Sequence, residues 1–231
     1  MHTNQWLALE TSTDTLSLAV SRDTHTWTHT SAGGALTSTH MIPQTLALLK
    51  EAGVALTDLQ SVVFGRGPGA FTGLRTACAV AQGLAFGANL PVLPIDTLLA
   101  VAETARELLQ HNATHIAIQG STPEVTRVLT VIDARMDQVY VAAYEHTCDG
   151  WCCVQAPEVL SPQALHWPAH WTAQSFVAAG NAWSVYAGRW PAQLQATRLD
   201  ALPTAQALIR LAPQAWREGL AVAPEDALPL Y

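Results

Sequence analysis

The chain has 231 residues, 49% of them apolar, and a formal net charge of −7. This length and apolar content allow one large or two small globular domains and exclude a disordered chain. Residues 77–95 are the most apolar, but glycine, proline and amide residues interrupt them, so they hold no bilayer-spanning run of about 20 residues. The start, MHTNQW, lacks the basic and apolar regions of a secretory signal, and we expect a cytoplasmic protein.

Basic residues are few: ten arginines and a single lysine, Lys50, scattered without a cluster. Binding to nucleic acid depends largely on clustered lysine and arginine that neutralise phosphates. The chain is therefore a poor candidate for holding RNA unaided. If RNA is involved, we expect a partner to hold it.

The first hundred residues predict three strands followed by a helix, a strand, a helix and a strand. Residues 6–20 begin this order as a β-hairpin, because an apolar run is followed by a polar turn at residues 11–15 and by alternating apolar residues. The later elements are a strand at 24–30, a helix from about 41 to 53, a strand at 61–65, a helix from about 71 to 86 with Gly87 as its cap, and a strand at 90–95.

Residues 65–76 form a glycine-rich stretch, GRGPGAFTGLRT, between an expected strand and an expected helix. Such a position suits a phosphate, because the backbone N–H groups of a helix N-terminus are partially positive. A Walker loop, however, requires lysine directly after its last glycine, and none is present here. A relaxed dinucleotide pattern is met, but Pro68 fixes a backbone angle inside it. We therefore assign no cofactor-binding residue to this stretch.

The second half of the chain repeats part of the first. VIDARMDQVYVAAY (131–144) aligns without gaps on ALETSTDTLSLAVS (8–21), with Asp133 on Glu10 and Asp137 on Asp14. This repeat predicts two lobes of related topology, at residues 1–95 and 96–231. Helices at 96–110 and 204–219, with strands near 115–119 and 176–179, complete the second lobe as a mixed α/β structure.

Four cysteines are present, three of them in or beside HTCDGWCC (146–153). Their spacing matches no standard zinc pattern, and Asp149-Gly150 between two β-like runs indicates a hairpin turn first. We expect no disulfide framework in a reducing compartment. We expect no metal ligand in this segment.

The duplicated strand-acid-turn-strand hairpin resembles the actin-like ATPase superfamily, which holds ATP phosphates between two such hairpins. In order and spacing, LALETSTDTLSLAV, GRGPGAFTGLRTACAVAQGLA, IDTLLAVA, VIDARMDQVYVA and PEDALPLY resemble the bacterial TsaB (YeaZ) family. The resemblance implies a two-lobed, ribonuclease-H-like duplicated α/β fold. It also implies a non-catalytic scaffold that activates TsaD, the subunit that transfers a threonylcarbamoyl group to the adenosine beside the anticodon of tRNA. A TsaE-type ATPase is a further implied partner, and tRNA is reached only through the complex.

A test against the catalytic members of the superfamily favours a non-catalytic chain. Their first hairpin carries Asp-x-Gly, whereas here Glu10 is followed by Thr11 and Ser12, so a side chain stands where bare backbone is required. TsaD-type enzymes hold a metal with two histidines four apart on a helix. None of the three His-x-x-x-His pairs in this chain fits that geometry: one lies on an expected strand, one spans a loop, and one encloses a proline. We assign no catalytic or metal residue.

Two alternatives stay open at this point. One is an autonomous ATPase or small-molecule kinase of the same fold. The other is a metallo-glycoprotease, against which the lack of a helical histidine pair counts.

The helix after the glycine-rich loop carries small residues four apart, Gly73, Ala77 and Ala81. Small residues at this spacing let another helix approach closely, so we expect docking to a partner, with packing inside the same lobe as the alternative. TsaB-like chains use this helix and the preceding one to pair with TsaD or with a second copy of themselves. Arg75 is expected to meet either a carboxylate or the partner. The expected interface consists of Phe71, Thr72, Gly73, Arg75, Thr76, Ala77, Val80 and Ala81.

Overall fold

The computed structural model describes residues 5–34, 37–111, 125–172 and 174–231. Contacts divide the chain into two compact units, Met1–Ala100 with Pro203–Tyr231, and Val101–Leu202. The division falls inside helix α3 (Thr97–His111). Among the helices described, none combines the length and the apolar character that crossing a bilayer would require.

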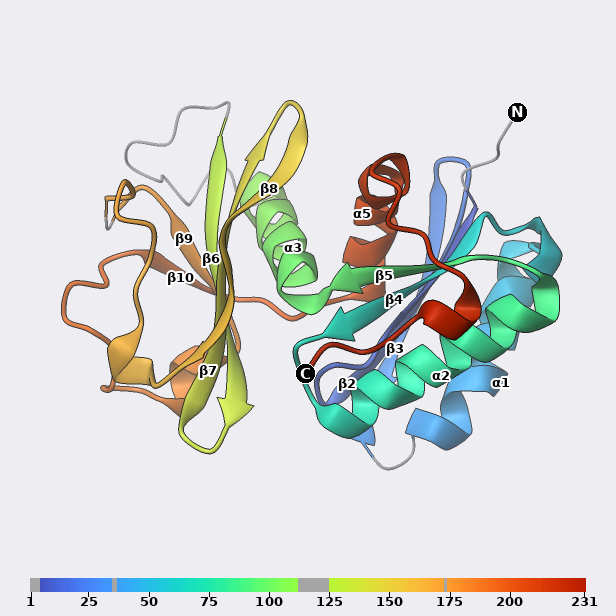
Figure 1. Ribbon diagram of the computed structural model, residues 1–231, viewed down its shortest axis with the longest axis horizontal. Helices are drawn as coiled ribbons and strands as arrows, with labels where there is room; N and C mark the ends of the chain where they lie inside the picture. The colour runs from blue at the N-terminus through green and yellow to red at the C-terminus, as the bar shows by residue number, and fades with distance from the viewer. Residues whose placement is uncertain (1–4, 35–36, 112–124, 173) are drawn as a thin grey trace. The chain divides into compact units, whose positions relative to one another are not determined.

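The first unit contains a five-stranded mixed sheet with the order β3-β2-β1-β4-β5 (Figure 1). Its strands are β1 (Trp6–Glu10), β2 (Thr15–Arg22), β3 (His25–Ala32), β4 (Ser61–Gly67) and β5 (Val92–Asp96). The first three pair antiparallel, whereas β4 joins β1 and β5 joins β4 in parallel. The strands and the first hairpin expected from the sequence are thereby confirmed.

Helices cover both faces of this sheet (Figure 1): α1 (Thr37–Ala52) and α2 (Phe71–Ala88) lie on one face and α5 (Ala205–Arg217) on the other. Alternate side chains of β1 point to the two faces of the sheet and contact the helices on each face. Leu7 and Leu9 belong to the core that includes residues of α1 and α2, while the ring of Trp6 lies 5.5 Å from that of Trp216, which belongs to α5.

The helix expected at 204–219 therefore packs on the first sheet and belongs to the first unit, whereas the repeat predicts it in the second lobe at 96–231. Its buried side, which includes Leu208 and Leu211, faces β1 and β2 of that sheet. The Thr204 hydroxyl caps the helix by accepting a hydrogen bond from the N–H of Ala207 at 3.1 Å. This long-range packing has no local sequence pattern, because it depends on the return of the chain to the first unit.

The second unit repeats the topology of the first sheet, with the order β10-β9-β6-β7-β8. Its elements are β6 (Thr126–Arg135), β7 (Gln138–Thr147), β8 (Gly150–Leu160), β9 (Val177–Gly180), α4 (Ala182–Val185) and β10 (Thr197–Asp200). Three antiparallel strands again continue into two parallel ones. The duplicated, ribonuclease-H-like α/β fold is confirmed. The strand expected near residues 115–119 lies outside the described residues.

The two aligned acids form the same local structure in the two units. The Oε1 of Glu10 accepts a hydrogen bond from the N–H of Ser12 at 2.6 Å. The Oδ1 of Asp133 likewise accepts from the N–H of Arg135, again two residues further on, at 2.8 Å. Each acid thus stabilises the turn that follows its strand, which confirms that the sequence repeat is structural.

Helix α2 ends two residues later than expected, and Gly87 is not its cap. Asn89 occupies the left-handed region with φ 55°, and its N–H returns to the carbonyls of Ala85 and Phe86. Asparagine tolerates this conformation better than most residues, so it replaces the expected glycine.

The glycine-rich loop before α2 packs directly on the turn of the first hairpin. The N–H of Ala70 donates to the carbonyl of Ser12 at 2.7 Å, and the Thr11 hydroxyl donates to the carbonyl of Gly73 at 2.8 Å. A Cβ at Gly69 or Gly73 would collide with the backbone of this turn. The glycines are therefore required for a close approach inside the unit.

This packing corrects the expected role of the small-residue stripe. Ala77 and Ala81 are fully buried in the core formed with the sheet, and Gly73 lies against Thr11. The stripe allows α2 to approach its own sheet, which is the alternative that the sequence left open. Ala77 and Ala81 face inward, away from solvent, and have no surface to offer a partner.

We predict that Ala77→Trp destabilises the chain by about 1 to 3 kcal/mol, because a large ring overpacks a filled core. Ala79→Trp is the matched control, since Ala79 is exposed on the same helix. Urea unfolding of both variants measures the difference. Equal stability of the two variants would contradict the inward orientation of residue 77.

Glu10 is a buried carboxyl group at the centre of the loop contact. Its side chain faces Gly65, where a Cβ would collide with Oε2, and Oε2 has no hydrogen-bond partner among the described residues. Burial raises the pKa of Glu10, and the hydrogen bonds from Ser12 and Thr11 only partly oppose this effect. The fold therefore favours the protonated form more than the unfolded chain does.

We predict that Glu10→Gln removes a pH-dependent loss of stability. Folding raises the pKa of Glu10, so the protonated carboxyl contributes to the free energy of unfolding. This contribution is fully present below the unfolded pKa and is lost as the pH rises through the folded pKa. The melting temperature of the variant should therefore exceed that of the wild type by a margin that grows as the pH rises above the ordinary pKa of a glutamate. Glu51→Gln, at an exposed position on α1, is the control, and parallel pH profiles of E10Q and wild type would refute the assignment.

Candidate interaction surface

The structure separates the eight residues of the expected interface by exposure. Phe71, Thr72 and Arg75 are exposed on α2, Gly73, Thr76 and Val80 are half-buried, and Ala77 and Ala81 are buried. The outward side of α2 is thus a different set of residues from the small-residue stripe. Further along the helix, Gly83 and Gly87 are exposed, and a Cβ at either would meet nothing within 4 Å.

Large apolar side chains are exposed on both helices that cover this side of the sheet. Leu46 of α1 is 51% exposed and Ile42 is 44% exposed, while Phe71 and Phe86 of α2 are 53% and 77% exposed. Helices α1 and α2 pack against each other on the same face (Figure 1). We call the set of Ile42, Leu46, Phe71, Arg75, Val80 and Phe86 the outer face.

Sequence reasoning missed Ile42, Leu46 and Phe86 as surface residues. Ile42 and Leu46 are four apart and follow directly after the buried residues Met41 and Thr45. They therefore lie about 100° around the helix from the core stripe. The apolar residues of α1 cover a wider part of the helix than the core can bury, and this width could have indicated from the sequence that Ile42 and Leu46 are exposed.

An aromatic and cationic cluster lies at the start of α2. The Cζ of Arg75 is 3.8 Å from the centroid of the Phe71 ring and 5.6 Å from that of Tyr231. The Nε of Arg75 donates to the Tyr231 hydroxyl at 2.8 Å, and the two rings lie 4.9 Å apart. In the described part of the chain Arg75 pairs with no carboxylate, and its contacts are with Phe71 and Tyr231.

Backbone contacts hold the segment that carries Tyr231. The N–H of Leu230 donates to the carbonyl of Arg66, at 2.6 Å, and the Nε2 of Gln82 donates to the carbonyl of Ala227 at 3.0 Å. The segment thus follows α2 and ends beside the glycine-rich loop. It positions Tyr231 over residues of the outer face.

A polar cavity of about 460 Å³ adjoins the outer face at the starts of α1 and α2. Its lining includes one carboxylate, that of Asp14. Five threonines supply hydroxyl groups: Thr11, Thr13, Thr37, Thr72 and Thr76. None of the described lining residues is lysine or arginine. The cavity therefore offers hydrogen bonds but no cationic side chain for an anion.

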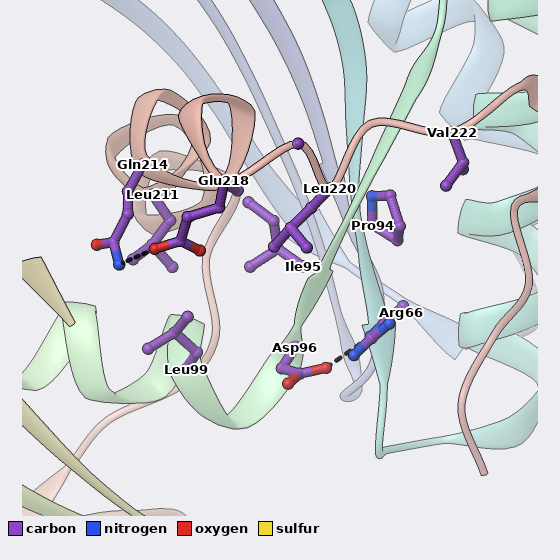
Figure 2. Close-up of a pocket in the computed structure, with 12 residues that line it drawn as sticks. Arg66, Pro94, Ile95, Asp96, Leu99, Leu211, Gln214, Glu218, Leu220 and Val222 are labelled. Carbon is purple, nitrogen blue, oxygen red and sulfur yellow. Dashed lines mark hydrogen bonds and ion pairs between the residues drawn. The ribbon is translucent and has the colours of Figure 1, made fainter. Parts of the chain in front are cut away.

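A second cavity, of about 320 Å³, lies between β5 and the end of α5 (Figure 2). Arg66 and Asp96 form an ion pair at 2.6 Å on one side, and Gln214 donates to Glu218 at 2.8 Å on another. Between them the lining is largely apolar and includes Ile95, Leu99, Leu211 and Leu220. Arg66 and Asp96 pair with each other, Glu218 accepts from the Gln214 amide, and the described lining holds no serine, cysteine or histidine that could act as a nucleophile or base.

The histidine pairs lie as the sequence predicted where they are described. His25 and His29 are on strand β3, and His111 ends α3, while His115 lies outside the described residues. The Nε2 of His166 is 3.0 Å from Glu158, whereas that of His170 is 3.7 Å from Glu145, so the two rings contact different acids.

The expected hairpin turn joins β7 and β8, with Cys148 and Asp149 as its two turn residues and Gly150 as the first residue of β8. The described residues contain no group of three or more metal-ligating side chains.

Comparisons with known proteins add to this geometry. Residues 36–206 match the family model of TsaD, described as tRNA N6-adenosine threonylcarbamoyltransferase. The tRNA threonylcarbamoyladenosine biosynthesis protein TsaB of Escherichia coli (strain K12) is 32% identical over 232 residues, which cover 97% of this chain and 93% of that protein. The protein of the same name from Haemophilus influenzae is 40% identical over 135 residues, covering 58% of this chain and 51% of that one.

A solved structure agrees over almost the whole length. YeaZ from Pseudomonas aeruginosa is 37% identical and matches with a TM-score of 0.83, covering 98% of this chain and 99% of that chain. This match confirms the resemblance carried by the sequence motifs. The chain belongs to the TsaB (YeaZ) family, and the greater part of it also matches the family model of the TsaD transferases.

Proposed function

We propose that this chain is a non-catalytic subunit in the synthesis of tRNA threonylcarbamoyladenosine, which binds and activates a TsaD-type transferase. The observation that carries the proposal is the outer face of α1 and α2, an apolar surface on a chain of the TsaB family. The relatives named above take part in threonylcarbamoyladenosine biosynthesis by their printed names. We extend that role to this chain.

The filled turn of the first hairpin supports a non-catalytic role. The side chains of Thr11 and Ser12 are buried, and they occupy the space between the turn and the start of α2. A nucleotide bound as in the catalytic superfamily would need its phosphates to approach bare backbone at this turn. Here the backbone of the turn instead contacts the glycine-rich loop of the same unit.

The composition of the outer face supports protein binding. Protein interfaces are enriched in aromatic residues and arginine and depleted of lysine and acidic residues, and a few such residues usually carry most of the affinity. The outer face combines two phenylalanines, one arginine and three aliphatic residues. We propose that the same face serves the heterodimer with the transferase and, when that partner is absent, a homodimer.

The distribution of charge supports indirect contact with tRNA. The chain has a net charge of −7, and its basic residues are not clustered in the sequence. We propose that tRNA is bound through the assembled complex, in the cytoplasm, and that a TsaE-type ATPase joins the same assembly. The chain alone supplies too few clustered cations for tight, salt-resistant binding.

We predict that Leu46→Glu, and separately Phe86→Ala, reduces co-purification with the transferase of the same cell at least about tenfold. A charge at residue 46, or the loss of the ring at residue 86, removes apolar contact from the proposed interface. Val185→Glu is the matched control, because Val185 is 56% exposed in the second unit and Leu46 is 51% exposed. Thermal melting of each variant confirms folding.

Two results would count against the proposed function. One is normal pairing by folded L46E and F86A variants, which would remove the outer face from the interface. The other is ATP hydrolysis by the purified chain alone that Glu10→Gln or Thr11→Gly alters in rate, which would favour an autonomous ATPase or kinase.

A further inference from the structure

Arg75 is the lone formal charge on the outer face. Helix α2 contains no other lysine, arginine, aspartate or glutamate along its 18 residues. The charged residues of α1, Lys50 and Glu51, lie in its last turn. A partner that covers the outer face would therefore bury or approach one cation within an apolar surround, where an unpaired charge is strongly unfavourable.

The guanidinium of Arg75 is held in place but not neutralised. It lies over the Phe71 ring with its Cζ at 3.8 Å, and its Nε donates to the Tyr231 hydroxyl. Within the described chain neither Nη atom of Arg75 takes part in a hydrogen bond or an ion pair. Up to four N–H donors thus stay available in the planar fork that matches a carboxylate.

The stacking lowers the cost of using this group in binding. An arginine side chain loses several rotatable bonds when a partner immobilises it, and contacts that order it beforehand reduce that loss. Phe71 and Tyr231 supply this order, with exposed fractions of 53% and 58% that leave their rings open to a partner as well. Arginine and tyrosine are enriched in interface hot spots, and phenylalanine is enriched in interfaces generally.

We propose that Arg75 binds a carboxylate side chain of the TsaD-type transferase, with Phe71 and Tyr231 as the residues that position it. This inference rests on the proposed function, and it identifies the chemical group of the partner that Arg75 binds. A carboxylate fits better than a nucleic-acid phosphate, because Arg75 is the single cation of α2, whereas contact with RNA requires several cations in line.

The test compares four variants with the wild type by calorimetric titration into the purified transferase. We expect Arg75→Gln to weaken binding about 30-fold or more, since the partner's carboxylate would be left buried and unpaired. Arg75→Lys should restore part of the affinity through its charge, and Tyr231→Phe should cost about threefold to tenfold because only the hydrogen bond to Nε is lost. Arg217→Gln, exposed on α5, should bind as the wild type does.

A charge reversal identifies the carboxylate. Arg75→Glu should abolish binding, and one Asp→Arg or Glu→Arg variant of the transferase should restore it specifically with R75E.

If the folded R75Q variant binds the transferase as tightly as the wild type, the inference is overturned while the proposed function stands. If R75Q lowers only the affinity of the complex for tRNA, the partner group is a phosphate and the inference is also overturned. If the wild-type chain does not bind the transferase at all, the proposed function itself fails.

Discussion

The contact between the first hairpin turn and the start of α2 determines how the surface of the first unit is divided. Two hydrogen bonds, from Ala70 to Ser12 and from Thr11 to Gly73, fix the start of the helix at the turn. No side chain larger than hydrogen fits at residue 73, so the helix must place its small residues toward the sheet. The opposite side of the helix, with Phe71 and Phe86, is consequently left in solvent. The inner contact and the outer face are therefore two results of one constraint.

The same hairpin occurs twice but has a different environment in each unit. Both acids accept the N–H two residues ahead, yet Glu10 has an unpartnered, buried oxygen, whereas Asp133 also accepts from the Tyr186 hydroxyl at 2.7 Å and pairs with Arg135. Burial, together with the hydrogen bond to Asp133, raises the pKa of Tyr186 to about 12. Burial thus favours the neutral form of the first acid, whereas the second acid has the side chains of Tyr186 and Arg135 as additional partners. Duplication preserved the backbone of the turn while the surrounding side chains diverged.

Local patterns were sufficient for most elements and for the repeat. The two hairpins, the helices α1, α2, α3 and α5, and the parallel strands β4, β5 and β9 follow from periodicity and turn residues, whereas the strand β10 and the short helix α4 were not predicted. The packing of α5 on the first sheet could not be predicted in this way, because an amphipathic helix carries no mark of the sheet that it covers. The stripe of Gly73, Ala77 and Ala81 was ambiguous for a related reason: small residues allow close approach equally to a partner helix and to the chain's own sheet. Only the three-dimensional position of Thr11 distinguishes the two.

The inward stripe also explains why recognition should depend on the larger outer residues. Ala77 and Ala81 are already removed from water in the isolated chain, so a partner can bury no further area there. Apolar area that stays exposed, as at Leu46 and Phe86, is what association can still remove from water at about 25 cal/mol per Å². Such apolar burial is not directional and would accept many partners, including a second copy of the chain. A fixed cation among these residues would add specificity, because it favours a partner that places an acid opposite it and disfavours partners that do not.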